Sequence, residues 1–219
     1  MTDTKQLRLH LGCGQVHLDG YVNIDFPTSE HTVQEKSVAD EFADITKLSY
    51  KPGSVSEVRL HHTYEHFIRS IACALLASWY SWLCEGGIVH VEVPDFTRTA
   101  LSVLSPLSSE QTKAVGLRHI FGSNEAAWAV HYEGWSLPRL TKLLELFGFE
   151  LTESKRNSWH GTFNIEVIAK KTATKLSKKD LEEKARQYLK EFLLDDSELP
   201  LLAVWMQQYR EQIDQTWAK

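Results

Sequence analysis

The chain of 219 residues has few cysteines and no long apolar run. Its three cysteines are spread along the sequence at Cys13, Cys73 and Cys84, which excludes a disulfide framework and indicates the reduced thiols of a cytoplasmic protein. No segment approaches the about 20 consecutive apolar residues that a membrane-spanning helix needs. The N-terminal run 1–5 lacks the apolar region of a signal peptide. We therefore expect a cytoplasmic protein without a membrane span.

An excess of positive charge is also missing. The formal net charge is -5, so a broad electrostatic grip on phosphate backbones is not expected and nucleic acid is an improbable partner. The hydrophobic fraction of 42% and the charged fraction of 24% are typical of globular proteins, which argues against a disordered chain. The length fits one α/β domain with an appendage.

Short β-branched runs alternate with helix-like stretches up to about residue 171. This alternation predicts a Rossmann-like α/β fold, with a mostly parallel sheet and helices on its faces. A helix over 68–83 is expected to stop at Glu85-Gly86-Gly87, and another over 137–147 at Gly148. Residues 149–153 and 162–170 are expected to form a hairpin-like pair of strands, which adds an antiparallel strand at the edge of the sheet. The expected strands are 7–11, 21–25, 55–61, 88–93, 149–153 and 162–170.

Two segments depart from this alternation. Residues 97–136 have no clear period, and we expect them to form a lid or substrate-binding insertion within a main domain of residues 1–171. Residues 172–219 predict a C-terminal extension of two amphipathic helices. We expect these helices to pack back on the core or to pair in a homodimer rather than to act in catalysis. Their apolar stripes are Leu181, Ala185, Tyr188, Leu189 and Phe192, then Leu202, Trp205, Met206, Tyr209 and Ile213.

A glycine turn, Gly12-Cys13-Gly14, directly follows the first predicted strand. Glycine there allows close approach of a ligand to the backbone. Asp25 ends the second strand beside it, where a carboxylate can accept both hydroxyls of a ribose, so an adenosine-containing cofactor is indicated. Asp44 is expected before a further strand; it either accepts from the adenine amine or caps a helix or turn. A nicotinamide dinucleotide is disfavoured because the third glycine of G-x-G-x-x-G is replaced by His17 and few residues remain for a crossover helix.

Several motifs together resemble, in order, the landmarks of class I S-adenosylmethionine-dependent methyltransferases. They most resemble small bacterial methyltransferases associated with surface-polysaccharide biosynthesis, and the likeness covers residues 7–170. It implies S-adenosyl-L-methionine as cofactor, with Gly12, Cys13, Gly14 and Asp25 at its methionine and ribose parts. It also implies Asp44 at the adenine and His62 beside the sulfonium. The motifs are Leu9-His10-Leu11-Gly12-Cys13-Gly14, Gly20-Tyr21-Val22-Asn23-Ile24-Asp25, Ala43-Asp44-Ile45, His62-Thr63-Tyr64-Glu65-His66-Phe67, Gly86-Gly87, Pro94-Asp95 and Gly148-Phe149.

The histidines supply candidate bases for methyl transfer. A neutral imidazole can take the proton of an acceptor hydroxyl. The other main task of the enzyme is to align the acceptor oxygen, the methyl carbon and the sulfur. We predict His131 as the general base, because it lies in the insertion, with His66 second and Glu65 orienting a histidine. The alternative is that both histidines are structural. The expected acceptor is a hydroxyl of a sugar, a glycan or another small molecule, and Trp128, Trp135 and Trp159 are candidates to stack on a sugar ring.

Three other interpretations stay open. The chain could be a non-catalytic partner or regulatory subunit that keeps the fold, or a nicotinamide-dependent oxidoreductase. The run His62-Thr63-Tyr64-Glu65-His66 also matches H-x-x-E-H, a zinc peptidase pattern in which both histidines must lie on one helix face. Here the pattern straddles the end of a strand, so no metal site is expected.

Overall fold

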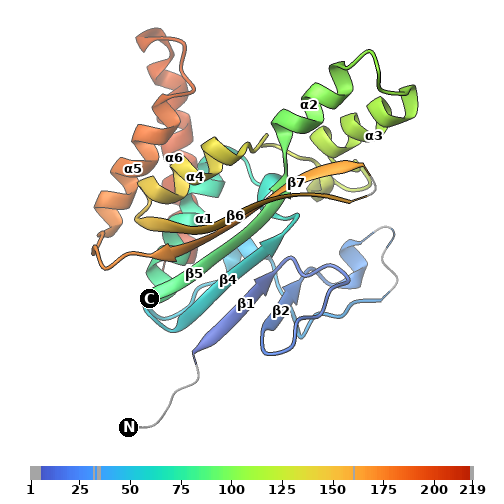
Figure 1. Cartoon of the computed structure of the whole chain (residues 1–219). Helices are drawn as coiled ribbons and strands as arrows, with labels where there is room; N and C mark the ends of the chain where they lie inside the picture. The colour runs from blue at the N-terminus through green and yellow to red at the C-terminus, as the bar shows by residue number, and fades with distance from the viewer. Residues whose placement is uncertain (1–5, 32, 34–35, 160, 218–219) are drawn as a thin grey trace.

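The computed structural model describes residues 6–31, 33, 36–159 and 161–217; the N-terminal run 1–5 therefore lies outside it. Its centre is a seven-stranded sheet with the order β3-β2-β1-β4-β5-β7-β6 (Figure 1). Strand β7 is antiparallel to both β5 and β6, and the remaining pairs are parallel, which confirms the predicted mostly parallel sheet. The strands are β1 (Leu7–Leu11), β2 (Val22–Asp25), β3 (Glu41–Phe42), β4 (Val55–His61), β5 (Leu83–Pro94), β6 (Phe149–Trp159) and β7 (Thr162–Lys171).

The described residues also form six α-helices and several short 3-10 turns, of which α5, η5 and α6 follow the last strand. None of these helices is long and apolar enough to cross a bilayer. The helices are α1 (Arg69–Trp82), α2 (Phe96–Leu104), α3 (Glu110–Phe121), α4 (Leu137–Leu146), α5 (Lys178–Lys190) and α6 (Leu199–Thr216). The 3-10 turns are η1 (Thr28–Glu30), η2 (Ile45–Lys47), η3 (Tyr64–His66), η4 (Ala127–Ala129) and η5 (Asp196–Glu198).

Two predicted boundaries were wrong. Helix α1 ends at Trp82 and β5 begins at the next residue, so Glu85-Gly86-Gly87 lies inside a strand rather than in a turn. Gly86 has φ +72° there, and the pairing of β4 with β5 is irregular at this point. The insertion 97–136 is not irregular: it contains most of α2 and all of α3, whose only buried residues are Thr99 and Gly116. Each of these two helices has a single fully buried residue, and neither was predicted from the sequence.

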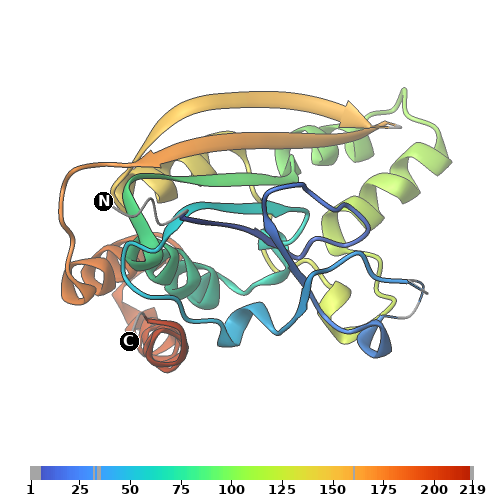
Figure 2. The ribbon, with the colours of Figure 1, turned by 90° about the horizontal axis from the view of Figure 1, so that it is seen from below.

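The sheet buries only one of its faces under helices. Alternate strand residues such as Leu9, Leu60 and Val91 join side chains of α1, α4, α5 and α6 in one apolar core. Figure 2 shows α1, α5 and α6 together on that side. The intervening strand residues form a polar network, in which Glu57 accepts hydrogen bonds from Arg8 and Tyr21. No helix of the described residues contributes to this polar network. The helices that the sequence predicts on the faces of the sheet therefore cover one face.

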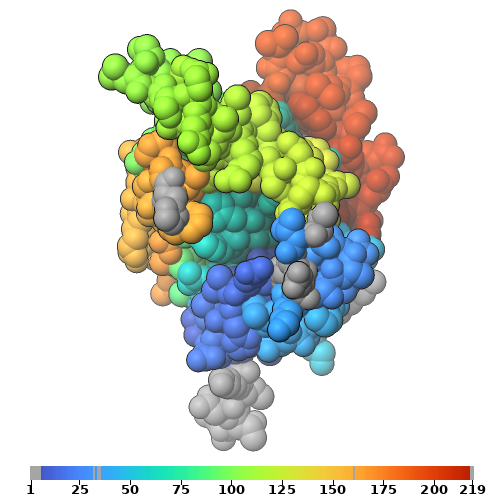
Figure 3. All heavy atoms as spheres, turned by 90° about the vertical axis from the view of Figure 1, so that its right-hand side faces the viewer, coloured from blue at the N-terminus to red at the C-terminus, as the bar shows by residue number. Residues whose placement is uncertain are grey.

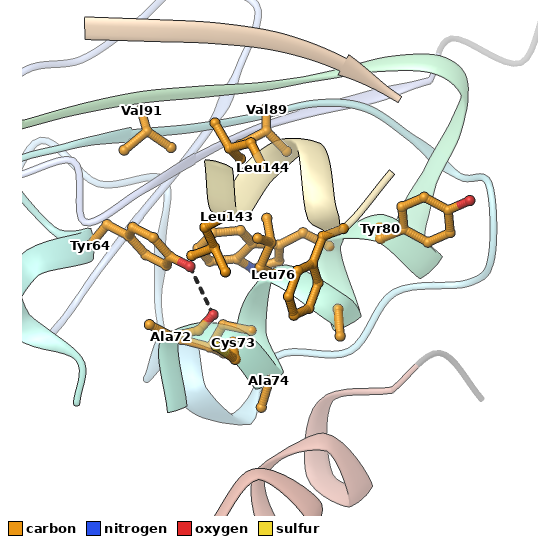
Figure 4. Close-up of a cluster of buried hydrophobic side chains, with 14 of the residues drawn as sticks. Tyr64, Ala72, Cys73, Ala74, Leu76, Tyr80, Val89, Val91, Leu143 and Leu144 are labelled. Atoms are coloured by element: carbon orange, nitrogen blue, oxygen red, sulfur yellow. Dashed lines mark hydrogen bonds between the residues drawn. The ribbon is translucent and has the colours of Figure 1, made fainter. Parts of the chain in front are cut away.

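Helix α1 is the centre of the core, and Figure 4 shows side chains from β5, α4 and η3 gathered around it. The Tyr64 hydroxyl donates to the carbonyl of Ala72 at 2.9 Å, which ties η3 to the first turns of α1. On the opposite side of α1, the hydroxyls of Ser78 and Thr216 lie 2.7 Å apart and are buried. The predicted C-terminal pair of amphipathic helices is thus present and packs back on the core.

Candidate functional site

A cavity of about 580 Å³ opens at the carboxyl ends of β1, β2 and β4. In Figure 3 the surface is hollowed between the blue N-terminal loops and the yellow-green segment above them, over the teal β4–α1 region. Ligands of open parallel sheets bind at this end of the strands. The cavity is lined by Gly12, Cys13, Gly14, Gln15, Val16, Asp25, Phe26, His31, Val33, Ala43, Asp44, Ile45, Thr46, His61, His62, Thr63, His66, Phe67, Glu125 and Trp128.

The glycine turn forms one wall of this cavity. Gly12 and Gly14 have φ values of +68° and +56°, a conformation that side chains with a Cβ disfavour. A Cβ on Gly12 would lie 2.4 Å from the Thr63 hydroxyl oxygen, whereas a Cβ on Gly14 would meet nothing within 4 Å. The turn therefore packs tightly against the β4–α1 connection through Gly12 and leaves open space above Gly14. Burial raises the pKa of the Cys13 thiol to about 12, so this wall stays uncharged.

Asp25 lies at the end of β2 with only 7% of its surface exposed. Its Oδ2 accepts a hydrogen bond of 2.5 Å from the Gly14 N–H, and its Oδ1 accepts one of 2.7 Å from the Phe26 N–H. The His31 Nε2 is 3.6 Å from Oδ1. Each carboxylate oxygen keeps a second lone pair, so Asp25 can still accept two hydroxyl groups from a ligand in the cavity.

Asp44 lines the cavity but does not precede a strand. It follows β3 and caps η2, where its Oδ1 accepts from the Thr46 N–H at 2.9 Å and from the Thr46 hydroxyl at 2.6 Å. Burial raises its pKa, but these hydrogen bonds and the nearby Lys47 outweigh burial and lower it. The position expected from the sequence was wrong, and the alternative of a cap is confirmed. A contact with adenine remains a prediction.

His62 follows β4 with a φ of +53°, so H-x-x-E-H does not lie on a helix. This backbone turn places its Nδ1 3.3 Å from the Glu65 Oε1. Burial lowers the pKa of His62, but the neighbouring Glu65 carboxylate outweighs burial and raises it. The spacing of the zinc peptidase pattern is not met, for the reason that the sequence suggested.

The structure brings Glu65, His66 and His131 together, although His131 lies far along the chain from the other two. The Tyr132 N–H donates to the Glu65 carbonyl at 2.9 Å and the His131 N–H to the Phe121 carbonyl at 3.1 Å. His131 is therefore held in place by backbone hydrogen bonds. Its side chain is 11% exposed and it does not line the cavity, whereas His66 does. The structure thus places His66, and not His131, at the cavity; the role of His131 as a base stays a prediction.

Sequence reasoning missed other residues at the cavity. His61 lies beside Glu92 of β5, with 3.3 Å between His61 Nε2 and Glu92 Oε2, and His31 contacts both Asp25 and the Trp128 ring. His61 is adjacent to the motif that was singled out, so its position at a strand end could have been noticed. His31 lies in a loop with no pattern that signals a site. Of the three tryptophans, Trp128 lines the cavity, Trp135 belongs to the core and Trp159 is 70% exposed.

The fold is shared with solved methyltransferase structures. One is a chain of the complex between the Haloferax volcanii Trm112 methyltransferase activator and a protein assigned as a methyltransferase. It has a TM-score of 0.55 and 11% identity, over 79% of this chain and 85% of that one. Another is the Burkholderia thailandensis 1,6-didemethyltoxoflavin-N1-methyltransferase with S-adenosylhomocysteine bound, at a TM-score of 0.50 and 12% identity, over 76% of this chain and 72% of that one. This chain has the Rossmann-like methyltransferase fold. The sequence matches no family model, and no curated protein matches it.

The cavity has the size of a small-molecule site. Its volume is within the range of about 300–1,000 Å³ typical of small-molecule sites. Open space above Gly14 admits a ligand close to the backbone, and the buried Asp25 carboxylate faces the same space. Within the described residues no helix joins β1 to β2, so a pyrophosphate would find no helix N-terminus there. The site thus suits a single nucleoside better than a dinucleotide with its pyrophosphate.

Proposed function

We propose that this chain is an S-adenosyl-L-methionine-dependent methyltransferase. The observation that carries the proposal is the Gly14–Asp25 hydrogen bond at the wall of the cavity, in a sheet of the methyltransferase order. This contact holds an acid in place for two ribose hydroxyls. Gly12, Cys13 and Gly14 would contact the methionine part, Asp44 the adenine, and His62 the region beside the sulfonium.

When bound, S-adenosylmethionine supplies a methyl group on a sulfonium sulfur, and the C–S bond breaks with its electron pair going to sulfur as the acceptor bonds to the methyl carbon. The chain's own residues have to align the acceptor and take its proton. His66 is the better placed of the two predicted bases, because it lines the cavity. Its Nδ1 lies 3.1 Å from the Val130 carbonyl, which can only accept, so Nε2 is left to take a proton.

We further propose a hydroxyl of a sugar, glycan or other small molecule as the acceptor. Trp128 on the cavity wall supports this choice, because an indole ring can stack on a sugar face. A role in surface-polysaccharide biosynthesis and a cytoplasmic location belong to the same proposal. We also propose that residues 1–171 form the methyltransferase domain and that its insertion 97–136 binds the acceptor. The extension 172–219 is proposed to form a homodimer.

The test is calorimetric titration of the purified protein with S-adenosylmethionine, S-adenosylhomocysteine and NADH in parallel. Micromolar binding of the two sulfur nucleosides, without NADH, is expected. Binding of NADH alone would replace the proposal with the oxidoreductase. Binding of none of them would leave the non-catalytic partner as the explanation. A screen with radiolabelled methyl donor and a panel of nucleotide sugars and glycans then identifies the acceptor.

A further inference from the structure

The carboxylate of Glu65 is buried beside His62 but has no hydrogen bond of regular geometry. Only 1% of the residue is exposed, and neither Oε1 nor Oε2 has a hydrogen-bond partner among the described residues. The polar groups near it are the His62 Nδ1 at 3.3 Å and the His131 Nε2 at 3.9 Å, both from Oε1. A buried carboxylate in this state is costly, so such groups are normally paired or bound to a metal ion.

Two histidines present ring nitrogens to the same place. One ligand atom from each of Glu65, His66 and His131 can be chosen so that all lie within 4.8 Å of one another, and the two imidazole rings are 4.7 Å apart at their centroids. A tetrahedral ion with bonds of about 2.0–2.2 Å would hold its ligands about 3.3 Å apart. Small side-chain rotations would close the difference.

The tautomers of both histidines suit a ligand role. The Nδ1 of His66 lies 3.1 Å from the Val130 carbonyl, and the Nδ1 of His131 lies 3.0 Å from the His119 carbonyl. A carbonyl only accepts, so Nδ1 is the donor in each ring and Nε2 carries the lone pair. A backbone carbonyl behind each ring is the usual outer support of a metal-bound histidine.

From this arrangement we propose that Glu65, His66 and His131 bind one divalent first-row transition ion, of the Zn²⁺ type. Two imidazole nitrogens and one carboxylate favour such an ion over Mg²⁺ or Ca²⁺, which prefer oxygen ligands. The site departs from the sequence-based expectation of no metal. It does not use the H-x-x-E-H spacing, because its second histidine ligand comes from the segment after η4.

A neighbouring trio, His61, His62 and Glu92, is a weaker candidate. Its ligand atoms are also within 4.8 Å of one another. However, Glu92 Oε1 already accepts from the side-chain amides of Asn157 and Asn164, at 3.1 and 3.3 Å, and Oε2 faces His61. Its carboxylate is therefore satisfied, whereas that of Glu65 is not.

The ion would act on the acceptor, and this role rests on the proposed methyltransferase function. His66 lines the cavity, so an ion bound to it would lie beside the cavity, within reach of an acceptor. An acceptor hydroxyl bound there would have a lowered pKa and release its proton to water before its oxygen bonds to the methyl carbon. His66 would then serve as a ligand in place of a proton acceptor.

The experiment is a titration of chelator-treated protein with Co²⁺, followed by visible absorption, with competition by Zn²⁺ and by Mg²⁺. We expect one equivalent of Co²⁺ to bind, Zn²⁺ to displace it and Mg²⁺ to leave it in place. Glu65→Gln, His66→Gln and His131→Gln should each weaken Co²⁺ binding by at least about tenfold, a loss seen even when outer supports are removed. His17→Gln, at an exposed histidine, is the matched control and should change nothing.

Three results would overturn the proposal: no binding up to millimolar Co²⁺, retained affinity in all three variants, or loss of binding in His61→Gln alone. If Glu65→Gln does not fold, as judged by circular dichroism, the test rests on His66→Gln, since His66 is only partly buried. Titration of the metal-free protein with S-adenosylhomocysteine separates the two proposals, since the cofactor residues are different ones. Binding of the nucleoside without binding of Co²⁺ would remove the metal site and keep the methyltransferase.

Discussion

The backbone N–H of Gly14 donates a 2.5 Å hydrogen bond to the Oδ2 of Asp25. It joins the end of β1 to the end of β2 without an intervening helix. The acid is thereby positioned by the glycine turn itself, so the two motifs act as one unit. Changes at either should affect both the turn and the bound ribose.

Asp25→Ala should weaken binding of S-adenosylhomocysteine by about 1 to 3 kcal/mol, or about 5- to 150-fold in Kd, because buried hydroxyls would lose their acceptor. Calorimetric titration measures the change. Asp214→Ala on α6, whose side chain is 71% exposed, is the control and should leave the affinity as it is. Equal affinities in wild type and Asp25→Ala would remove Asp25 from the cofactor site.

Gly12→Ala should lower the melting temperature more than Gly53→Ala. Both glycines have φ near +70°, so alanine costs about 1–2 kcal/mol at each through the backbone. Only at Gly12 does the added Cβ meet Thr63, at 2.4 Å, and this overpacking adds about 1–3 kcal/mol. Thermal unfolding of Gly12→Ala with and without Thr63→Ala gives the decisive comparison. The second substitution should restore part of the loss, and no restoration would show that the clash is not the cause.

Glu57 should make stability depend on pH in acid. Burial raises the pKa of this carboxyl, but contacts with His90, Tyr21 and Arg8 outweigh burial and lower it to about 2, from an ordinary 4.5. Since the folded pKa is the lower one, the stabilisation is complete above pH 4.5 and is lost as the pH falls toward 2. Glu57→Gln should therefore unfold at lower urea than wild type at pH 7, and the difference should shrink between pH 4.5 and 2. A difference that is constant over this range would contradict the assignment.

Ile213→Ala on α6 should destabilise the chain by about 2–5 kcal/mol, since this side chain is 1% exposed and lies in the common core. Val204→Ala on the same helix, at a residue 51% exposed, should change the free energy of unfolding by less than about 0.5 kcal/mol. Urea unfolding of both variants tests this. Light scattering after size-exclusion chromatography, run on the same samples, tests the proposed homodimer.

The strands were predictable where burial alternates along them. The pattern of Val55–His61 gave β4 with its observed bounds, because Val58 and Leu60 enter the core while Glu57 and Arg59 face the polar network. Helices α2 and α3 were not predictable in this way, since they bury almost nothing. The prediction at Glu85-Gly86-Gly87 was wrong because two glycines indicate a turn, yet here they lie inside strand β5 where its pairing with β4 is irregular.

The cavity wall of the glycine turn and Asp25 was predictable because these residues lie at the ends of two strands, and the ends of neighbouring parallel strands meet. The surroundings of Glu65 were not, because they depend on contacts between distant segments. The Tyr132 N–H to Glu65 carbonyl bond, which brings His131 into place, has no counterpart in any local pattern. Burial of the Glu65 carboxylate likewise becomes visible only after the chain has folded.

Helix α6 closes over α1 through the buried Ser78–Thr216 pair and the bond from the Trp82 indole N–H to the Thr216 carbonyl. Domains begin to form while the chain is still leaving the ribosome. During synthesis α1 emerges far ahead of α6, so its apolar outer surface faces solvent until α6 follows. A nascent chain stalled before residue 199 would present that surface to chaperones, and release of the chain from them would coincide with the docking of α6.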